Sequence, residues 1–356
     1  MNHLSDLPNN AITFGYPFES LSVALVHLPL EILVNITEFL STKDILNLSV
    51  CSKYLHELLY VVKLNIKVKY DKISRLSYFD SFTYVVYEKS GNIFPKSLQL
   101  LDWECNENLP CILPNSLQSI HLGDYYNQSL PALPHSLQSL HLGWNYDQQL
   151  QQLPDSLQSL HLSNCYNQPL SCRVFDHNGV IIMREPQLPN SLKNLHLGNC
   201  YNQPLPQLPD SLQSLHFGYY YNQPLPQLLD SIRSLHFGYY YNQPLLQLPH
   251  SLQDLNLGWT YNQSLPQLPV SLKNLILGYY YNQALPQLPN SLQSIDLGYY
   301  FDQPLLQLPN SLQNLIISWC YNQPLPEFPN SLKYIKIPKY FLPSALPSHV
   351  TIEFFD

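Results

Sequence analysis

Apolar residues recur along most of the chain at a fixed spacing of 20 residues. One copy reads SLQSIHLG over 116–123, continues with YNQ over 126–128, and ends in Leu-Pro at 133–134. The Leu-x-x-Leu-x-Leu segment has neither helical nor pure strand spacing over its length, and its end, Ile120 to Leu122, suits a short strand entered through a turn. Proline recurs too often in the remainder for a helix to form there. Each copy therefore predicts one strand and one extended, proline-fixed return segment.

The first serine of each copy marks the period. These serines are Ser116, Ser136, Ser156, Ser191, Ser211, Ser231, Ser251, Ser271, Ser291, Ser311 and Ser331. One step is 35 residues long, which places an insertion at 171–185. Eroded copies near Ser97 and after Ser331 extend the repeats over 97–350, with a terminal cap at 351–356. Stacked at about 4.8 Å per copy, the strands predict a repeat solenoid with one parallel β-sheet over a continuous core.

Composition narrows the possible partners. Charged residues make up 12% of the chain, and the net charge of -8 lies entirely after residue 100. An acidic rod cannot neutralise phosphates, so we expect no nucleic-acid partner. No apolar run is long enough for a membrane span, the N-terminus lacks the pattern of a signal peptide, and seven cysteines show no disulfide spacing. We expect a cytoplasmic location, with the nucleus as an alternative.

Columns that repeat in every copy are expected to be structural. Asn127 begins an Asn/Asp column beside an unbroken glutamine column that starts at Gln128. Short amides at a bend can satisfy backbone groups of their own turn and of the next one. The aromatic column that begins at Tyr126 is expected to form core.

Two outward columns are the candidates for binding a target protein. The candidate residues are His121, His141, His161, His196, His216, His236, Trp144, Tyr220, Tyr240, Trp259, Tyr280, Tyr300 and Trp319. The histidines form a partner-binding strip or a polar strand face inherited by duplication. The aromatic residues form a contact ridge or stack on each other and shield the edge of the solenoid. A flat histidine row does not converge on a metal, and no nucleophile or carboxylate recurs beside it, so we expect no metal, cofactor or catalytic residue.

Cysteines and the insertion offer weaker signals. Cys165 and Cys200 occupy one column in adjacent copies, within reach of a disulfide, although paired free thiols suit a reducing compartment. The insertion carries Cys172, Asp176, His177 and Glu185. Their spacing matches no metal motif, and we expect an exposed loop.

The segment 28–60, after an N-terminal tail over 1–27, has helical spacing. Pro29 suits a first helical turn, Ser41 or Thr42 can cap a second helix, and Val50 to Leu58 continue onto a third. Three helices in so short a segment cannot bury a full core, which implies either a partner surface or a small cap on the solenoid. Residues 61–96 alternate in part and predict strands that connect the helices to the repeats.

Both parts resemble known families. The repeat is similar to leucine-rich repeats of the short bacterial Leu-Pro type, and its Tyr-Asn-Gln-Pro-Leu segment resembles the FNIP repeat of social amoebae and giant amoeba viruses. The order Leu28-Pro29-x-Glu31, Ile36, Phe39-Leu40, Asp44-Ile45-Leu46 and Val50-Cys51 resembles an F-box, with Tyr54 as a mild departure. The F-box resemblance implies docking on a Skp-type adaptor, and through it on a cullin. The residues it implies in or behind this contact are Leu28, Pro29, Ile32, Leu33, Ile36, Leu46, Leu48, Val50 and Cys51.

The combination predicts a non-catalytic substrate receptor of an SCF-type ubiquitin ligase, in the host cytoplasm if the chain is viral. An alternative is a binding scaffold or a decoy that sequesters the host adaptor. Bacterial ubiquitin ligases with similar repeats carry a separate catalytic cysteine domain, and because the repeats run nearly to Asp356 we expect none here. Few lysines follow residue 100, namely Lys193, Lys273, Lys333, Lys336 and Lys339, so the solenoid either resists self-ubiquitination or inherited this scarcity by duplication.

Overall fold

A computed structural model describes residues 28–89, 93–170, 173–175, 181–183, 188–340 and 348–355. The chain divides into two compact units, one up to Gly143 and the other from Trp144. Each unit contains a stack of parallel strands, and the repeats are joined by extended return segments, which is the predicted solenoid architecture. Among the described residues, no helix has the length and apolarity needed to cross a membrane.

The first unit begins with short helices: α2 (Leu30–Thr37), α3 (Thr42–Ser49), α4 (Lys53–His56) and α5 (Leu58–Val61). Pro29 precedes the first turn of α2, and the Ser41 hydroxyl accepts the Asp44 N–H to cap α3. These are the two helix starts that the sequence predicts. Leu33, Leu55 and Leu58 form a small buried cluster between the helices.

The sheet of the first unit begins before the recognisable repeats. Its strands are β1 (Leu64–Lys69), β2 (Phe82–Tyr87), β3 (Leu100–Trp103), β4 (Ser119–Leu122) and β5 (Ser139–His141), paired in parallel in this order. Helix α6 (Tyr70–Ile73) and the 3-10 turn η2 (Phe79–Ser81) connect β1 to β2. The predicted connecting strands are therefore the first two strands of the same sheet.

The second unit continues the same design with one short strand in each turn. Its parallel sheet contains β6 (Ser159–His161), β9 (Asn194–His196), β10 (Ser214–His216), β11 (Ser234–His236), β12 (Asp254–Asn256), β13 (Asn274–Ile276), β14 (Ser294–Asp296), β15 (Asn314–Ile316), β16 (Tyr334–Ile337) and β17 (Thr351–Phe354). Equivalent residues pair directly, as in Leu215 with Leu235. The described return segments of this unit contain no helix, in agreement with their proline content.

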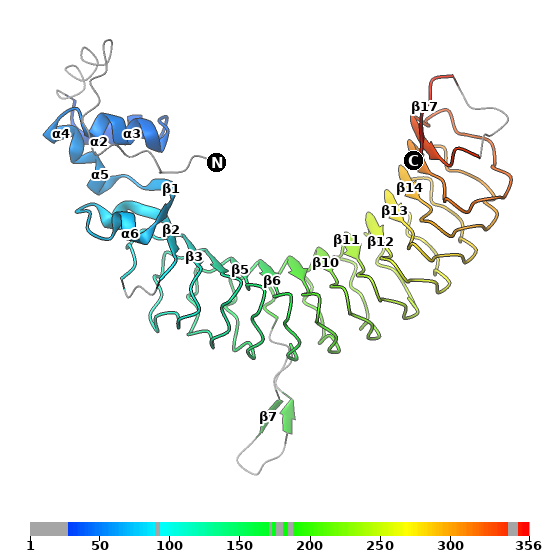
Figure 1. Cartoon of the computed structure of the whole chain (residues 1–356), viewed down its shortest axis with the longest axis horizontal. Helices are drawn as coiled ribbons and strands as arrows, with labels where there is room; N and C mark the ends of the chain where they lie inside the picture. Colours follow the sequence, from blue (N-terminus) through cyan, green and yellow to red (C-terminus); the bar gives the residue numbers. More distant parts are fainter. Residues whose placement is uncertain are drawn as a thin grey trace. The chain divides into compact units, whose positions relative to one another are not determined.

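Part of the insertion, predicted as an exposed loop, forms a two-stranded hairpin. Strands β7 (Arg173–Phe175) and β8 (Ile181–Met183) pair antiparallel, with Val174 opposite Ile182 (Figure 1). Cys172, Asp176, His177 and Glu185 lie outside the described residues.

The core consists of columns that repeat from turn to turn. Leu215 and the leucine column around it are fully buried, and the tyrosine column that includes Tyr221, Tyr241 and Tyr261 is 0% exposed. The predicted core role of this tyrosine column is confirmed. Neighbouring rings lie parallel, with centroids 6.1 Å apart between Tyr221 and Tyr241. Burial raises the pKa of these hydroxyls, that of Tyr261 to about 12.

Asparagine side chains tie each turn to the next. The Asn242 N–H donates to Asn222 Oδ1 at 3.0 Å, and the Asn262 N–H donates to Asn242 Oδ1 at 2.9 Å. The neighbouring glutamine uses the same acceptor, as when Gln243 Nε2 donates to Asn222 Oδ1. The predicted structural role of the amide columns is confirmed. Their side chains satisfy backbone donors that a return segment without a strand leaves unpaired.

Glycine after the strand permits the tight stacking of the turns. A Cβ added to Gly238 would lie 1.8 Å from the Gly218 carbonyl oxygen, so no other residue fits without displacing backbone. Gly258 and Gly298 also adopt φ values of 74° and 72°, a region that favours glycine. This glycine column is therefore structural.

Candidate functional site

The helical segment of the first unit exposes several large apolar side chains. Phe39 is 89% exposed, Val50 is 82% exposed and Ile32 is 45% exposed. Phe39 follows α2, and Val50 is the C-cap residue directly after α3. Apolar side chains so open to solvent, within one short segment, are typical of a surface that a partner covers.

The predicted adaptor-binding residues fall into three groups. Pro29, Ile32, Val50 and Cys51 are exposed, and Leu28, Ile36, Leu46 and Leu48 are half-buried. Leu33 is 2% exposed and packs in the helical core, so it can support the contact but not form its surface. Sequence reasoning included Phe39 in the motif but not among the contact residues, because helical spacing alone does not show which apolar positions stay open.

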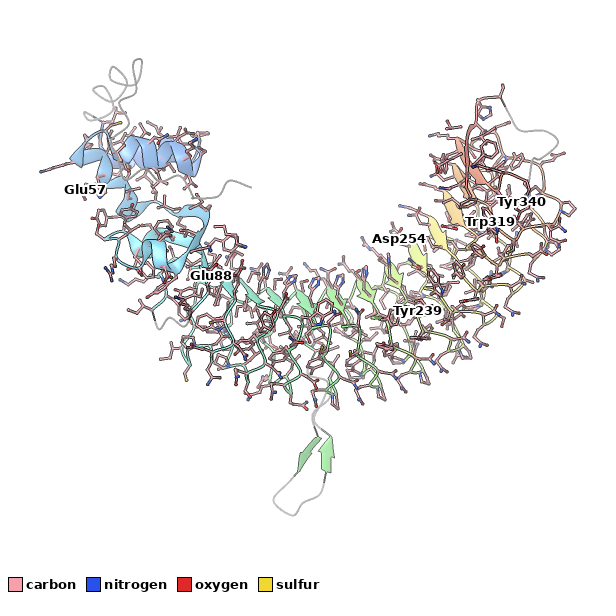
Figure 2. The ribbon with its side chains drawn as sticks, in the orientation of Figure 1. Glu57, Glu88, Tyr239, Asp254, Trp319 and Tyr340 are labelled. Carbon is pink, nitrogen blue, oxygen red and sulfur yellow. The ribbon has the colours of Figure 1, made fainter. Side chains whose placement is uncertain are left out.

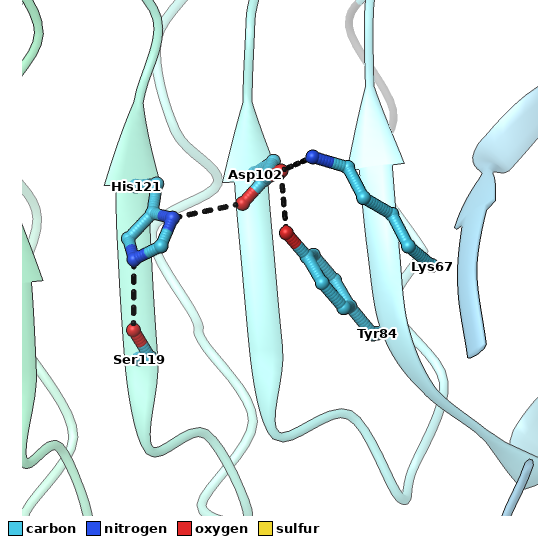
Figure 3. A network of polar contacts seen from close by, with 5 residues as sticks. All are labelled: Lys67, Tyr84, Asp102, Ser119 and His121. Carbon is cyan, nitrogen blue, oxygen red and sulfur yellow. Dashed lines mark hydrogen bonds and ion pairs between the residues drawn. The ribbon is translucent and has the colours of Figure 1, made fainter. Parts of the chain in front are cut away.

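A network of polar side chains crosses four strands of the first unit, β1 to β4 (Figure 3). Asp102 on β3 accepts from Lys67 Nζ at 2.6 Å and from the Tyr84 hydroxyl at 2.9 Å. Its other oxygen lies 3.2 Å from His121 Nδ1, and His121 Nε2 lies 3.3 Å from the Ser119 hydroxyl. The carboxylate is thus buried with its two oxygens occupied, which is the arrangement that a buried charge requires.

The network holds Asp102 ionised. Burial works against the charge, but hydrogen bonds from His121, Lys67 and Tyr84 outweigh it and lower the pKa of Asp102. The hydrogen bond to Asp102 in turn raises the pKa of Lys67. The sequence contained a signal for this site, because Asp102 occupies the histidine position of an eroded copy and pairs with His121 across the sheet.

Serine, histidine and carboxylate in this order also occur in acyl-transfer triads. Here, however, Ser119 is only 8% exposed, and its N–H donates to the Gln99 carbonyl within the sheet. That N–H is therefore not available to stabilise an oxyanion. The network instead fixes the orientation of the His121 ring, which contacts Asp102 through Nδ1 and Ser119 through Nε2.

The predicted histidine column forms stacked rows of imidazoles. In the second unit, ring centroids lie 4.0 Å apart between His161 and His196, 4.2 Å between His196 and His216, and 4.3 Å between His216 and His236. In the first unit, His121 and His141 lie 4.4 Å apart, edge to face. Burial is the main cause that lowers the pKa of His196, His216 and His236, that of His216 to about 4. These three rings are therefore neutral at neutral pH.

The predicted aromatic column resolves into two rows at one edge of the second unit. The inner row contains Tyr219, Tyr239, Trp259, Tyr279, Tyr299 and Trp319, and the outer row contains Tyr220, Tyr240, Tyr280 and Tyr300. Rings of the inner row stack on each other, with centroids 4.2 Å apart between Trp259 and Tyr279. At the end of the row, Trp319 lies edge to face with Tyr340 (Figure 2).

The rings shield each other and still remain open to solvent. Tyr220 is 51% exposed, Tyr240 is 44% exposed and Trp259 is 39% exposed, while Trp144, near the start of this unit, is 58% exposed. Both sequence interpretations of the column are therefore compatible with this edge, and its role in binding stays a prediction.

Cys165 and Cys200 lie on adjacent turns as predicted. The Cys200 N–H donates to the Asn164 carbonyl at 2.8 Å, and both thiols are free and half-exposed. Burial, and then the neighbouring Cys165 thiol, raise the pKa of Cys200. A raised pKa keeps this thiol protonated and slow to react.

The fold defines a class: a parallel solenoid of the leucine-rich-repeat type with a small N-terminal helical segment. The model of the FNIP Repeat family matches over residues 106–143, 126–165, 185–220, 201–229, 221–260, 261–287 and 281–320, which together exceed half of the chain. The chain therefore belongs to the family of FNIP-repeat proteins. The model of the F-box domain matches residues 25–67, so both resemblances seen in the sequence are confirmed.

Solved structures support the same architecture. CroV588, described as a novel circular LRR protein, is 32% identical, with a TM-score of 0.61 over 77% of this chain and 46% of its own. YopM from Yersinia enterocolitica WA-314 is 23% identical, with a TM-score of 0.55 over 78% of this chain and 64% of its own, and shows the fold alone. The chain thus spans about half and about two thirds of their lengths. No curated protein matches the chain.

Proposed function

We propose that this protein is a substrate receptor of an SCF-type ubiquitin ligase. In this proposal, the F-box docks on a Skp-type adaptor, which binds a cullin, and the solenoid holds a target protein. The observation that carries the proposal is the F-box match over residues 25–67 in a chain whose repeats stack as parallel strands and expose aromatic rows. Holding a target lysine near the ubiquitin carrier raises its effective concentration without any catalytic group in the receptor.

Adaptor docking depends on the exposed apolar side chains rather than on the buried ones. Replacement of Phe39 or Val50 by aspartate removes apolar contact area and places a charge in the interface. We expect each variant to weaken adaptor binding at least 30-fold, because central apolar contacts commonly contribute about 2 kcal/mol or more. Leu33→Asp is the poorer test, since it places a charge in the helical core and unfolds the segment.

The experiment is co-purification and calorimetry of the full chain with a Skp-type adaptor. Leu306→Asp is the matched control, because Leu306 is 92% exposed and lies in the second unit, outside the F-box. Normal adaptor binding by both Phe39→Asp and Val50→Asp, with their helical circular dichroism retained, would contradict the docking surface.

Ubiquitination separates a receptor from a decoy. With the adaptor, cullin and ubiquitin enzymes supplied, a receptor increases ubiquitin transfer to bound target, whereas a decoy binds the adaptor without increasing transfer.

Three lysines of the solenoid hydrogen-bond to the preceding turn: Lys193, Lys273 and Lys333 each donate to a glutamine there, at 3.0–3.1 Å. If these hydrogen bonds protect the solenoid from self-ubiquitination, mass spectrometry will find little ubiquitin on these lysines. Heavy modification of Lys193 or Lys273 would overturn this interpretation.

A further inference from the structure

The outer tyrosine row is interrupted at one turn of the second unit. Tyr220 and Tyr240 precede the interruption, Tyr280 and Tyr300 follow it, and Thr260 occupies the intervening position. The backbone there keeps the register of its neighbours, since the Thr260 N–H donates to the Tyr239 carbonyl as the Tyr280 N–H donates to the Trp259 carbonyl. The turn therefore lacks only a ring. We call this position the Thr260 gap.

The dimensions of the Thr260 gap follow from the row itself. Ring centroids lie 5.6 Å apart between Tyr220 and Tyr240, and 5.3 Å apart between Tyr280 and Tyr300, with planes within 15° and 8° of parallel. Two such steps place Tyr240 and Tyr280 about 11 Å apart, so a ring midway between them lies about 5.5 Å from each, inside the range of favourable aromatic pairs.

Neighbouring side chains leave the Thr260 gap open on its solvent side. Tyr240 and Tyr280, which border it, are 44% and 45% exposed, and Trp259 of the same turn is 39% exposed. In four other turns of this edge, the inner ring has an outer ring packed edge to face against it, as Tyr239 has Tyr240 at 4.8 Å. Trp259 stacks on Tyr239 and Tyr279 but has threonine where that outer ring would be.

The Thr260 side chain does not compensate for the missing ring. Its hydroxyl donates to the Tyr239 carbonyl at 2.8 Å, so the polar group is turned back onto the backbone. The gap is thus bordered by two ring faces and the edge of Trp259. A flat aromatic ring between them completes both the stacked row and the edge-to-face pair.

We propose that the Thr260 gap binds one aromatic side chain, tyrosine or tryptophan, of the target protein. The inference rests on the proposed function for the identity of the partner, whereas the aromatic chemistry follows from the row. Residues after position 100 carry 8 basic and 16 acidic side chains, a balance that disfavours the phosphates of a stacked nucleotide. Tyrosine and tryptophan are the side chains most often found as interface anchors in such pockets.

Three variants isolate the Thr260 gap. Thr260→Tyr fills it with the residue that four other turns of this row carry. Thr260→Ser keeps it open and preserves the hydroxyl. Cys320→Tyr is the matched control for an added ring, because Cys320 occupies the next position of the same row after Tyr300 and leaves the gap open. Equal thermal midpoints of the four proteins will show that differences in binding do not come from unfolding.

The probe is a blocked five-residue peptide, glycine on both sides of 5-fluorotryptophan, observed by fluorine NMR with the full-length chain. We expect saturable one-site binding with a dissociation constant of about 1 mM, since a single side chain supplies few contact atoms. Thr260→Tyr should weaken binding at least 10-fold, while Thr260→Ser and Cys320→Tyr bind like the wild type. Tyr240→Leu and Tyr280→Leu should each weaken it about 5-fold.

Several results would overturn the proposal. The first is the absence of saturable peptide binding, and the second is equal peptide binding by Thr260→Tyr and the wild type. The third is binding of free 5-fluoroindole without binding of the peptide, because that result would indicate a small aromatic molecule as the ligand. Adaptor binding is measured on the same Thr260→Tyr protein. If Thr260→Tyr no longer binds the peptide but binds the adaptor normally, the inference is supported. If the wild type binds no adaptor, the proposed function is refuted, and the peptide result alone decides whether the Thr260 gap binds an aromatic side chain.

Discussion

His216 offers a direct measurement of how deeply the histidine row is desolvated. Its ring stacks between His196 and His236, and its Nε2 lies 2.9 Å from the Ser214 hydroxyl. Burial, and then the charges that His196 and His236 would carry, lower the pKa of His216 to about 4. At a pH of about 5.5 such a ring is roughly 3% protonated, against roughly 90% for an ordinary histidine.

The same shift makes stability depend on pH. The unfolded chain takes up the proton at a pKa of about 6.5, well above that of the folded state, so the stabilisation is complete above that pH and is lost as the pH falls toward 4. For a fully buried ring, this pKa difference would change the free energy of unfolding by about 3 kcal/mol. We expect a change of about 1–2 kcal/mol, because the ring is only half-buried. His196 and His236 act in the same direction.

The assay combines NMR titration of labelled histidine rings with urea unfolding at several pH values. His216→Asn introduces the residue that the row carries at Asn256 and should reduce the loss of stability between about pH 7 and about pH 5 by about 1 kcal/mol. His250→Asn is the control, because His250 is exposed and lies outside the row. Titration of His216 near 6.5, or equal pH dependence of both variants, would refute the reasoning.

Two further predictions concern the packing of the solenoid. Gly238→Ala should lower the free energy of unfolding by about 3 kcal/mol, because its Cβ would lie 1.8 Å from the Gly218 carbonyl oxygen. Gly278→Ala should lower it by less, because the Cβ there would lie 2.9 Å from its nearest atom. The opposite order in urea unfolding would contradict the stacking argument. Asp102→Asn should cost about 1–2 kcal/mol at neutral pH, because it removes the charged acceptor of the bonds from Lys67, Tyr84 and His121, while water can hydrate the half-exposed Lys67. It should also remove part of the acid sensitivity, since a lowered carboxyl pKa stabilises the fold above about pH 4 and this stabilisation is lost below it. Unchanged unfolding midpoints at neutral pH would argue against the network.

Much of the architecture was predictable because one short unit is written many times. A strand that ends in leucine at position 122, followed by prolines, has few ways to bury its apolar side chains except by stacking on its own copies. The same logic assigned Tyr126 to the core and Asn127 to the ladder between turns. Helix starts at Pro29 and Ser41 were predictable because caps are local features.

The candidate sites were predictable only in part. The sequence placed six histidines and a set of aromatic residues in outward columns, but not how their rings would meet. It placed Leu33 in the docking motif, whereas the fold buries Leu33 and exposes Phe39. Helical spacing defines an apolar face, and only the packing of the other helices decides which part of that face remains open.

By itself, then, the sequence determined the period, the strand and return of each turn, the buried columns and the N-terminal helices, because these depend on local chemistry and on repetition. Tertiary structure decided which outward side chains touch: the stacked imidazoles, the bonds from Lys67 to Asp102 and from Asp102 to His121, and the Thr260 gap between Tyr240 and Tyr280. The physical reason is the spacing and register of adjacent turns, which place residues about 20 positions apart at van der Waals distance and appear in no single copy of the repeat.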